Sequence, residues 1–411
     1  MTNKRVLNYG VLAIPIAILG MPLYIYLPTF YVQDIGLNTA LVAALLFFAR
    51  LLDMFADPFI GNLSDRYFSK KSLIVIGAFS LLISFYFLIN PFNNYPTFSL
   101  IFFSIITYIS WSLINIPYLA LNATIGKNSF DNSKLSFSRE IFTIIGVLVA
   151  LLIPFLFNAS SDSKRSLELI FYVLVFVLPL VLVFFALNIK EQNSINITIS
   201  FKDSIKSFYE KFKEQKNLFF AFIINNLANA IPATLFLFYV QYYLKTPQFT
   251  GALLILYFLS AIIAVPFWLN FSKKIGKRKT WIISMAFASF FFCLTPFLNE
   301  GDYIKFAFIT FFTGLCLGAD MALPSSIQAD IAQNSKKLGK EISGTLFGFW
   351  AMLTKLALAL AVFITFTILE LVSFDIDNPT NFSLFILSIL YSILPVILKI
   401  ISIILIAKNK V

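Results

Sequence analysis

The sequence contains no histidine and only two cysteines among its 411 residues. The absence of histidine excludes imidazole general bases, triads that need histidine and most zinc sites. Because Cys293 and Cys316 both lie in apolar segments, the chain offers neither a disulfide framework nor a CxxC motif. Charged residues are also scarce: they make up 12% of the chain, against about 25% in soluble proteins. A chain with so few charges cannot cover a surface that faces water.

Hydrophobic residues make up 59% of the chain, and they occur in runs that are long enough to cross a bilayer as helices. The sequence therefore predicts an all-α membrane protein with twelve transmembrane helices. The predicted spans are residues 7–31, 37–63, 72–90, 97–123, 139–158, 167–189, 218–244, 250–271, 280–298, 303–330, 342–369 and 382–407. The alternation of a membrane β-barrel is not found. The first run is too long for a signal-peptide core, so we expect it to stay in the protein.

The net charge of +11 is distributed unevenly between the two sides of the predicted membrane. If the N-terminus is cytoplasmic, 24 of the 31 lysines and arginines lie on the cytoplasmic side and four lie outside. This asymmetry follows the positive-inside rule and predicts that both termini are cytoplasmic. We expect a multi-pass protein of the bacterial cytoplasmic (inner) membrane, whose basic residues contact anionic lipid and not nucleic acid.

Short internal repeats divide the chain into two sets of six helices. Three pairs of matching residues are separated by 208, 203 and 207 positions: Phe30–Gln33 with Phe238–Gln241, Phe68–Lys71 with Phe271–Lys274, and Pro117 with Pro324. Six helices repeated in one orientation are typical of major facilitator transporters. We expect six-helix bundles at 1–189 and 218–411, joined by a cytoplasmic linker at 190–217. Residues 201–212 of this linker form either a short amphipathic helix or a solvated segment.

The densest group of charges inside a predicted span is formed by Arg50, Asp53 and Asp57. Their spacings of three, four and seven residues place the three side chains on one helix face. Two carboxylates one turn apart in a low dielectric cannot both ionise without a nearby cation. The pair therefore predicts a site for Na⁺, Li⁺ or H⁺. The alternative is that Asp57-Pro58 only marks the end of the helix.

This segment also resembles a known family. Arg50, Asp53, Asp57-Pro58, Gly61 and Ser64-Asp65-Arg66 resemble the second helix and following loop of the glycoside–pentoside–hexuronide:cation symporters, the melibiose permease group. Weaker matches follow in order along most of the chain: Ile116–Leu121, Ser138-Arg139, Leu323-Pro324, Ala329-Asp330, Phe347–Trp350 and Lys355. The resemblance implies a major facilitator fold and transport of a solute together with a cation.

The resemblance also implies roles for individual residues. Asp53 and Asp57 correspond to the paired cation ligands of the family, and Ser112 falls where a fourth-helix hydroxyl ligand is expected. Lys355 corresponds to a central lysine near that pair, and with Arg50 it would complete a charge network. A lysine near mid-span also needs a carboxylate partner on physical grounds, although snorkelling is an alternative. For Lys399, closer to the inner end of the last helix, we expect snorkelling.

Several positions depart from the sugar-binding pattern of the family. Ala56, Asn115 and Leu119 replace a cation-ligating asparagine, a sugar-binding aspartate and a stacking tryptophan, and residues 13–18 lack the first-helix aspartate. Of the sugar-contacting set, only Arg139 remains. The substrate-binding candidates are therefore Asn115, Arg139, Asn225, Asn229, Asp320 and Trp350. The two asparagines of the seventh span could equally bond between helices, and Asp320 could serve a proton instead of the substrate.

A second group of polar residues is predicted at the cytoplasmic helix ends. Asp65, Arg66, Lys134 and Asp330 are candidates for an inner gate, in which Lys134 would contact Asp330 in an outward-facing state. Solvated surface positions are the alternative for this pair.

Together these features predict a cation-coupled secondary active transporter that moves a small organic solute by alternating access. The solute is a sugar or glycoside in this interpretation, the coupling ion is Na⁺ or H⁺, and the protein acts as a monomer. No enzyme activity and no cofactor are expected, because no nucleophile–base group, phosphate loop or metal cluster is found. One alternative is a carrier of lysophospholipids or other amphiphiles, favoured by apolar residues at Ile18 and Leu119. Another is a receptor or assembly protein without transport, against which the charges inside the spans argue.

Overall fold

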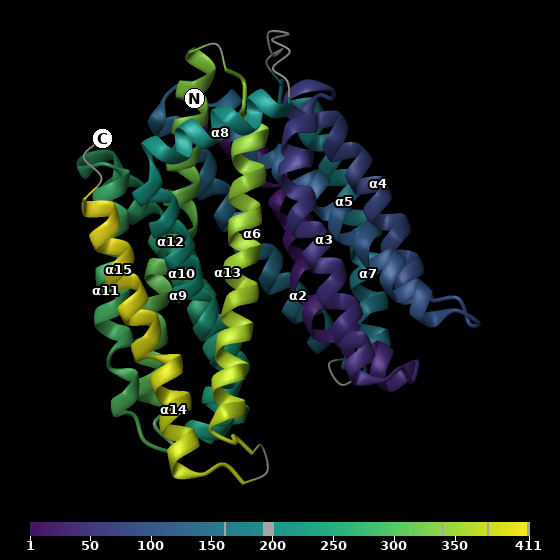
Figure 1. Ribbon diagram of the computed structural model, residues 1–411, viewed down its shortest axis with the longest axis vertical. Coiled ribbons are helices and arrows are strands. Elements are labelled where there is room, and N and C mark those ends of the chain that lie inside the picture. The colour runs from purple at the N-terminus through teal and green to yellow at the C-terminus, as the bar shows by residue number, and fades with distance from the viewer. Residues whose placement is uncertain (160–161, 192–200, 339, 376–377, 409–411) are drawn as a thin grey trace. The chain divides into compact units, whose positions relative to one another are not determined.

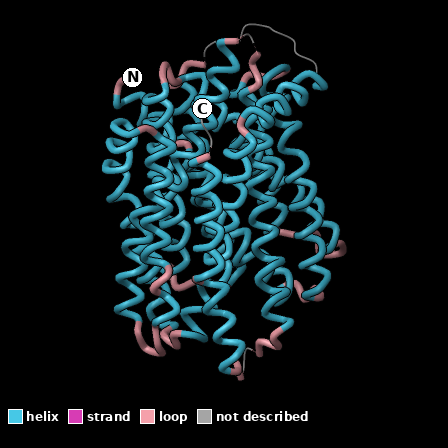
Figure 2. The backbone as a smooth tube through the Cα atoms, turned by 60° about the vertical axis from the view of Figure 1, so that its left-hand side comes forward, coloured by secondary structure: helices cyan, strands magenta, loops and turns pink. Residues whose placement is uncertain are grey.

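The structure is a computed structural model that describes residues 1–159, 162–191, 201–338, 340–375 and 378–408. The described residues form helices joined by short loops (Figure 2). Twelve segments of this part of the chain are long and apolar enough to cross a membrane, at the positions that the sequence predicts. The prediction of an all-α membrane protein with twelve spanning helices is confirmed.

The helices of the first half are α1 (Asn3–Gly10), α2 (Ala13–Thr29), α3 (Thr39–Arg66), α4 (Lys70–Ile89), α5 (Pro96–Ile125), α6 (Ser129–Leu156) and α7 (Ser163–Asn188). Those of the second half are α9 (Lys216–Phe238), α10 (Thr250–Ile275), α11 (Lys277–Phe292), α12 (Tyr303–Lys337), α13 (Ser343–Leu371), α14 (Asn381–Tyr391) and α15 (Ile393–Ala407). Between them, α8 (Phe201–Glu214) is helical, as one of the two interpretations of the linker predicts. The linker residues 192–200 lie outside the described part.

Local sequence signals explain where several of these helices begin. The side chain of Asn38 accepts hydrogen bonds from the backbone N–H groups of Ala40 and Leu41 at the start of α3. Ser69, Asn128 and Asp162 cap α4, α6 and α7 in the same way. With 28 residues, α3 is about 42 Å long, more than a hydrocarbon core of about 30 Å requires. It is therefore long enough to hold charged residues both in mid-membrane and at a membrane surface.

The first repeated tetrapeptide has the same structure in both halves, whereas the second does not: Phe68–Lys71 spans the break between α3 and α4, and Phe271–Lys274 lies within α10. Phe30–Asp34 and Tyr239–Tyr243 each form a π-helical turn at the end of their helix. The hydroxyl of the buried Tyr31 donates to the carbonyl of Leu88 at 2.8 Å, and Tyr239 donates to the carbonyl of Thr295 at the same distance. These two bonds link positions that are 208 and 207 residues apart, so the internal repeat extends to tertiary contacts.

The described chain divides into two compact units, which differ from the predicted sequence halves. Unit 1 contains Met1–Phe208 and Ser325–Met352, and unit 2 contains Tyr209–Pro324 and Leu353–Val411. In unit 1, α4 packs against α5 and α7, and α3 packs against α5 (Figure 1). The end of α12 and the start of α13 belong to unit 1 because a small apolar cluster joins them to α3 and α5. Its buried members include Ile60, Ile116, Ala329, Leu346 and Phe347. The division into two six-helix bundles with a linker stays a prediction.

Candidate cation site, solute residues and helix-end contacts

The two carboxylates of α3 are fully buried and lie one helical turn apart. The relative exposure of both Asp53 and Asp57 is 0%. Since α3 continues past Pro58 to Arg66, the alternative that Asp57-Pro58 marks the helix end is wrong. Because proline has no N–H, the carbonyl of Met54 cannot accept the usual helical hydrogen bond from residue 58. The carbonyl oxygen of Met54 is therefore a further oxygen acceptor on α3, between Asp53 and Asp57.

A hydroxyl from α5 contacts the first of these carboxylates. The Oγ atom of Ser112 donates a hydrogen bond to Oδ1 of Asp53 at 2.8 Å. Both side chains are buried, with exposures of 1% and 0%. The structure therefore brings together two of the three predicted cation ligands, from two different helices. Two carboxylates and a hydroxyl are oxygen donors of the kind that hard cations prefer, and a carboxylate can equally hold a proton.

Arg50 belongs to the same face of α3 and has an aromatic environment. Its guanidinium carbon lies 3.6 Å from the ring centre of Tyr108 on α5 and 4.3 Å from that of Tyr24 on α2. Its Nη1 atom is 3.9 Å from Oδ2 of Asp53, too far for a hydrogen bond but close enough for strong attraction. The side chain of Arg50 keeps 27% of its surface exposed, whereas that of Asp53 has none. The two tyrosines were not predicted from the sequence.

Three other predicted residues lie on α5 and α13. Asn115 is half-buried on α5, one turn beyond Ser112, and Trp350 is buried on the part of α13 that belongs to unit 1. Lys355 is half-buried on the part of α13 that belongs to unit 2. Its pairing with Asp53 or Asp57 stays a prediction.

Asp320 is the centre of a buried polar cluster in unit 2. Its Oδ1 atom accepts hydrogen bonds from Nε1 of Trp281 at 2.8 Å and from Nδ2 of Asn225 at 3.3 Å. Its Oδ2 atom accepts from Nζ of Lys399 at 2.5 Å and from Nδ2 of Asn229 at 3.2 Å. Lys399 also donates to Oδ1 of Asn225 at 3.0 Å. The five side chains come from α9, α11, α12 and α15.

This cluster corrects the interpretation of Lys399 and changes that of its neighbours. The prediction that Lys399 snorkels is wrong, because its side chain is only 10% exposed and forms an ion pair with Asp320. An ionised carboxylate has about four acceptor sites, and Asp320 uses four. No acceptor site on it is left for a solute hydroxyl or a proton. The geometry of Asp320, Asn225 and Asn229 thus favours bonding between helices over substrate binding.

Arg139, the one residue that remains from the sugar-contacting pattern, is buried and paired. Its guanidinium forms an ion pair with the neighbouring Glu140, to which Nε donates at 2.9 Å. Its Nη1 atom donates to Oγ of Ser325 at 3.0 Å. Spacing alone does not predict the pairing with Glu140, because adjacent residues on a helix do not face each other. The charge of Arg139 is therefore neutralised in this structure.

Asp65, one of the predicted gate residues, caps the N-terminus of α13. Its carboxylate accepts hydrogen bonds from the backbone N–H groups of Gly344 and Thr345, both at 2.7 Å, and from the hydroxyl of Thr345 at 2.9 Å. A negative charge is stabilised at this end of a helix by the first N–H groups and the helix dipole. Gly344 lies so close to Gly61 that a Cβ atom there would meet the Gly61 carbonyl oxygen at 2.3 Å. Glycine at both positions allows α3 and the start of α13 to touch.

A charge network that was not predicted surrounds this cap. The Nζ atom of Lys70 lies 4.0 Å from Oδ1 of Asp65 and 3.8 Å from Oε1 of Glu341. The Nζ atom of Lys336 lies 3.0 Å from Oε2 of Glu341. Burial alone would raise the pKa of Glu341, but Lys70, the hydroxyl of Ser343 and Lys336 together hold its pKa below the usual value. Glu341 therefore stays ionised in the loop between α12 and α13. The stabilisation from its ion pairs with Lys70 and Lys336 is present at neutral pH. It is lost only as the pH falls through this lowered pKa.

The predicted contact between Lys134 and Asp330 is wrong. Asp330 on α12 accepts hydrogen bonds from Oγ of Ser129 and Nδ2 of Asn132 on α6, both at 2.8 Å. Lys134 instead lies with its Nζ atom 5.0 Å from the ring centre of Phe130. Ser129 and Asn132 are three residues apart and share one face of α6, whereas Lys134 lies two residues beyond Asn132 and points to another face. Arg66 lies 5.0 Å from the ring centre of Tyr67 and stays a gate candidate only by its position.

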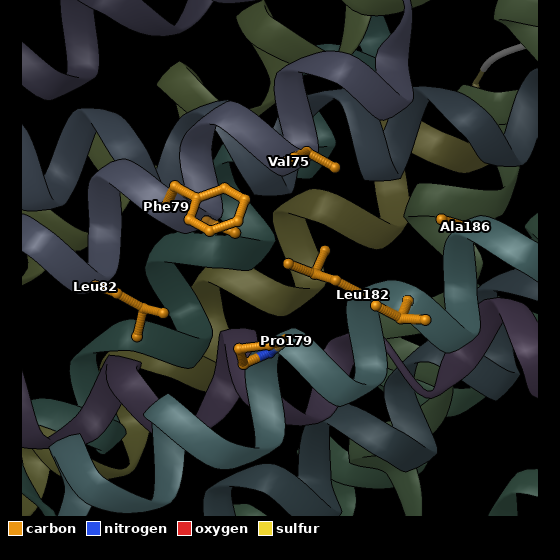
Figure 3. A pocket seen from close by; sticks show the side chains of 8 residues that line it. Val75, Phe79, Leu82, Pro179, Leu182 and Ala186 are labelled. Carbon is orange, nitrogen blue, oxygen red and sulfur yellow. The ribbon is translucent and has the colours of Figure 1, made fainter.

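An apolar pocket lies between α4 and α7 in unit 1 (Figure 3). It is lined by Val75, Ala78, Phe79, Leu82, Pro179, Leu182, Val183 and Ala186. None of these side chains can hydrogen-bond to a hydroxyl or pair with a charge. The pocket is therefore unsuited to a polar solute and matches a surface that contacts lipid chains.

Two solved transporters share this arrangement of helices. The fold aligns over 100% of this chain with the fucose transporter FucP, described as a major facilitator superfamily transporter, at a TM-score of 0.73 and 16% identity, covering 99% of that chain. It also aligns with the proton:xylose symporter XylE at a TM-score of 0.63 and 15% identity, covering 96% of this chain and 93% of that one. The chain therefore has the fold of these multi-pass membrane proteins.

The family itself is identified from the sequence. The family described as MFS/sugar transport protein matches residues 8–410, so the chain belongs to it. Curated relatives include the uncharacterized symporter YnaJ of Bacillus subtilis, 25% identical over 62% of this chain and 58% of that protein. The glucuronide carrier protein homolog of Escherichia coli is 22% identical over 80% of this chain and 75% of that protein. The isoprimeverose transporter of Lactiplantibacillus pentosus is 24% identical over 64% and 58%. The match thus spans less than two thirds of the first and third of these relatives.

Proposed function

We propose that this protein is a cation-coupled secondary active transporter of a small organic solute, a sugar or glycoside, with Na⁺ or H⁺ as the coupling ion. The observation that carries the proposal is the burial of Asp53 and Asp57 on one face of α3, with Ser112 bonded to Asp53. Two carboxylates without water around them bind a monovalent cation or a proton because the charge repulsion between them is relieved. The relatives, a symporter, a glucuronide carrier protein homolog and an isoprimeverose transporter, support this class of function.

Coupling follows from the free energy of cation binding. A cation that binds one conformation more tightly than another shifts the equilibrium between them, and the solute bound in the same conformation is then carried along. We propose that Asp53, Asp57 and Ser112 hold the cation and that Arg50 and Lys355 balance the charge when it leaves. Both termini lie in the cytoplasm and the protein acts as a monomer in the bacterial inner membrane in this proposal.

The amphiphile alternative has less support at residue level. It relied on apolar residues at Ile18 and Leu119 as the lining of a lipid site. Ile18 has 0% exposure and belongs to the core of unit 1, so its side chain is taken up by packing. Leu119 is half-buried against the small cluster between α3, α5 and α13. We therefore keep the sugar or glycoside as the proposed solute.

Uptake into proteoliposomes tests the proposal. Wild type should accumulate glucuronide or isoprimeverose, the solutes named for the relatives, when a Na⁺ or H⁺ gradient is imposed. Asp53→Asn and Asp57→Asn should each abolish accumulation, because losing one charged ligand in a desolvated site costs several kcal/mol. Asp34→Asn, the same change at an exposed position, is the matched control. Accumulation by both asparagine variants at the wild-type level would place the cation site elsewhere.

A further inference from the structure

Arg50 differs from two other cations that lie within the described spans. Arg139 pairs with Glu140, and Lys399 pairs with Asp320, and the side chains of both are at most about a tenth exposed. The side chain of Arg50 is 27% exposed and meets Asp53 only at 3.9 Å, without a hydrogen bond. Attraction to Asp53 thus holds Arg50 in place, while its donors are not consumed by that carboxylate.

The surroundings of Arg50 keep it away from the lipid-facing side of α3. The guanidinium lies against Tyr24 of α2 and Tyr108 of α5, whereas Phe48, Phe55 and Phe59 form the exposed apolar side of the same helix. A partly exposed charge among lipid chains is costly, so the exposed part of Arg50 must face water. Two aromatic rings restrict the plane of the guanidinium, and the Tyr108 side chain also hydrogen-bonds to it, which uses only part of its five N–H donors.

We infer that Arg50 is a specificity-determining residue that binds the carboxylate of an acidic sugar, and that cation binding at Asp53 releases it for this role. This inference rests on the proposed function. A guanidinium matches a carboxylate with two parallel hydrogen bonds, which a neutral sugar cannot accept with the same strength. While Asp53 is ionised, it competes with the solute for Arg50. A bound Na⁺ or proton neutralises Asp53, so the solute carboxylate becomes the best remaining partner.

This arrangement makes the binding of cation and solute cooperative through one side chain. A bound cation neutralises Asp53, which then no longer competes with the solute for Arg50. A bound solute pairs with Arg50, which then no longer competes with the cation for Asp53. By thermodynamic linkage the two effects on affinity are equal. The same geometry predicts that replacing Asp53 by a neutral residue imitates the cation-bound state toward the solute, although it destroys the cation site.

Calorimetric titration of the full chain in detergent tests this inference with two sugars that differ in one group. Methyl β-D-glucuronide carries a carboxylate where methyl β-D-glucoside carries a CH₂OH group. In the presence of Na⁺ or at acidic pH, wild type should bind the glucuronide roughly tenfold to a hundredfold more tightly. With K⁺ or choline as the only cation at neutral pH, this preference should fall.

Three variants test which residues cause the preference for the glucuronide and its dependence on the cation. Arg50→Gln should lose the preference for the glucuronide, and Arg50→Lys, which keeps the charge but not the fork, should retain part of it. Asp53→Asn should bind the glucuronide with little dependence on the cation. The control is Arg165→Gln, at an exposed position in the first turn of α7, which should behave as wild type. Thermal unfolding of each variant establishes that it is folded.

The outcomes separate this inference from the proposed function. Equal affinity for the two sugars, no binding of the glucuronide under any cation, or an unchanged preference in Arg50→Gln overturns the role of Arg50. An unchanged cation dependence in Asp53→Asn overturns the release step. The proposed function fails on a different measurement, namely when neither Na⁺ nor acid stabilises wild type in an Asp53-dependent way and no gradient drives uptake.

Discussion

The two buried carboxylate clusters, one on α3 in unit 1 and one on α12 in unit 2, use similar residues in opposite ways. Asp320 accepts four hydrogen bonds, one of them from a lysine at 2.5 Å, and its donors come from three other helices. Asp53 has its arginine at 3.9 Å, beyond hydrogen-bond distance, and shares its face of α3 with a second buried carboxylate. A carboxylate whose acceptor sites are filled by protein donors fastens helices together. One that is held next to a second carboxylate and a loosely associated arginine can exchange partners.

The comparison teaches that burial of a charge does not by itself identify a functional site in a membrane protein. Both clusters satisfy the rule that ionisable residues inside a span mark function. The distance to the basic partner separates them: the lysine lies 2.5 Å from Asp320, whereas the arginine lies 3.9 Å from Asp53, and we propose that only the second carboxylate serves a ligand. This distinction can be tested by asking which cluster carries stability and which carries transport.

The largest expected effect on stability comes from breaking the Asp320–Lys399 pair. Lys399→Met or Asp320→Asn leaves one uncompensated charge among apolar helices, which should cost about 3–5 kcal/mol. Thermal unfolding in detergent should show a strongly lowered midpoint for each single variant. The double variant should regain much of the loss, since no buried charge then remains. Lys408→Met, at an exposed position near the chain end, is the control. Two single variants as stable as wild type would refute the structural role.

A smaller loss of stability is expected from Trp281→Phe. This change keeps the aromatic ring but removes one of the four donors to Asp320, at 2.8 Å. A hydrogen bond to a charged group contributes about 1.5–3 kcal/mol, so the unfolding midpoint should fall by less than for Lys399→Met. The matched control is Trp111→Phe, whose Nε1 atom donates at 3.1 Å to the carbonyl of Ile16 and not to a charge. A larger effect for Trp111→Phe would contradict the special position of Asp320.

The smallest effect on stability should come from Asp53→Asn, although we expect this variant to lose coupled transport. Neutralising a carboxylate that is fully buried removes a desolvation cost, and the amide oxygen of the introduced side chain could still accept the hydrogen bond from Ser112. The midpoint of thermal unfolding should therefore stay near the wild-type value or rise. A fall as large as that of Asp320→Asn would mean that both clusters are structural.

The sequence predicted the fold well because apolar runs of fixed length determine it. The twelve spans, the repeated tetrapeptides and the helical part of the linker all follow from local composition and spacing. The contact between Asp53 and Ser112 also came from the sequence, through the family resemblance. These predictions succeed where one helix or one matched motif contains the necessary signal.

The residues that were missed depend on contacts that spacing along one helix does not describe. Lys399 is 79 positions from Asp320, and nothing in its own helix distinguishes a buried lysine from one that reaches the interface. Trp281 lies in an apolar run, where a tryptophan looks like any other lipid-facing side chain. Glu140 pairs with its direct neighbour, against the spacing rule for helices. In each case the partner is selected by three-dimensional packing, which periodicity does not encode.

The cap that Asp65 places on α13 has a consequence for how easily the protein can change shape. The groups it satisfies are two backbone N–H groups and a hydroxyl in the first turn of a helix, at the end of a span. Water can form the same bonds with each of these groups, so separating α3 from α13 there replaces one set of hydrogen bonds by another. Because the acceptor is a carboxylate, each bond contributes about 1.5–3 kcal/mol net, less than it would cost to break the bond without water. A contact built from bonds that water can substitute can open and form again, which suits a molecule that must repeat its cycle many times.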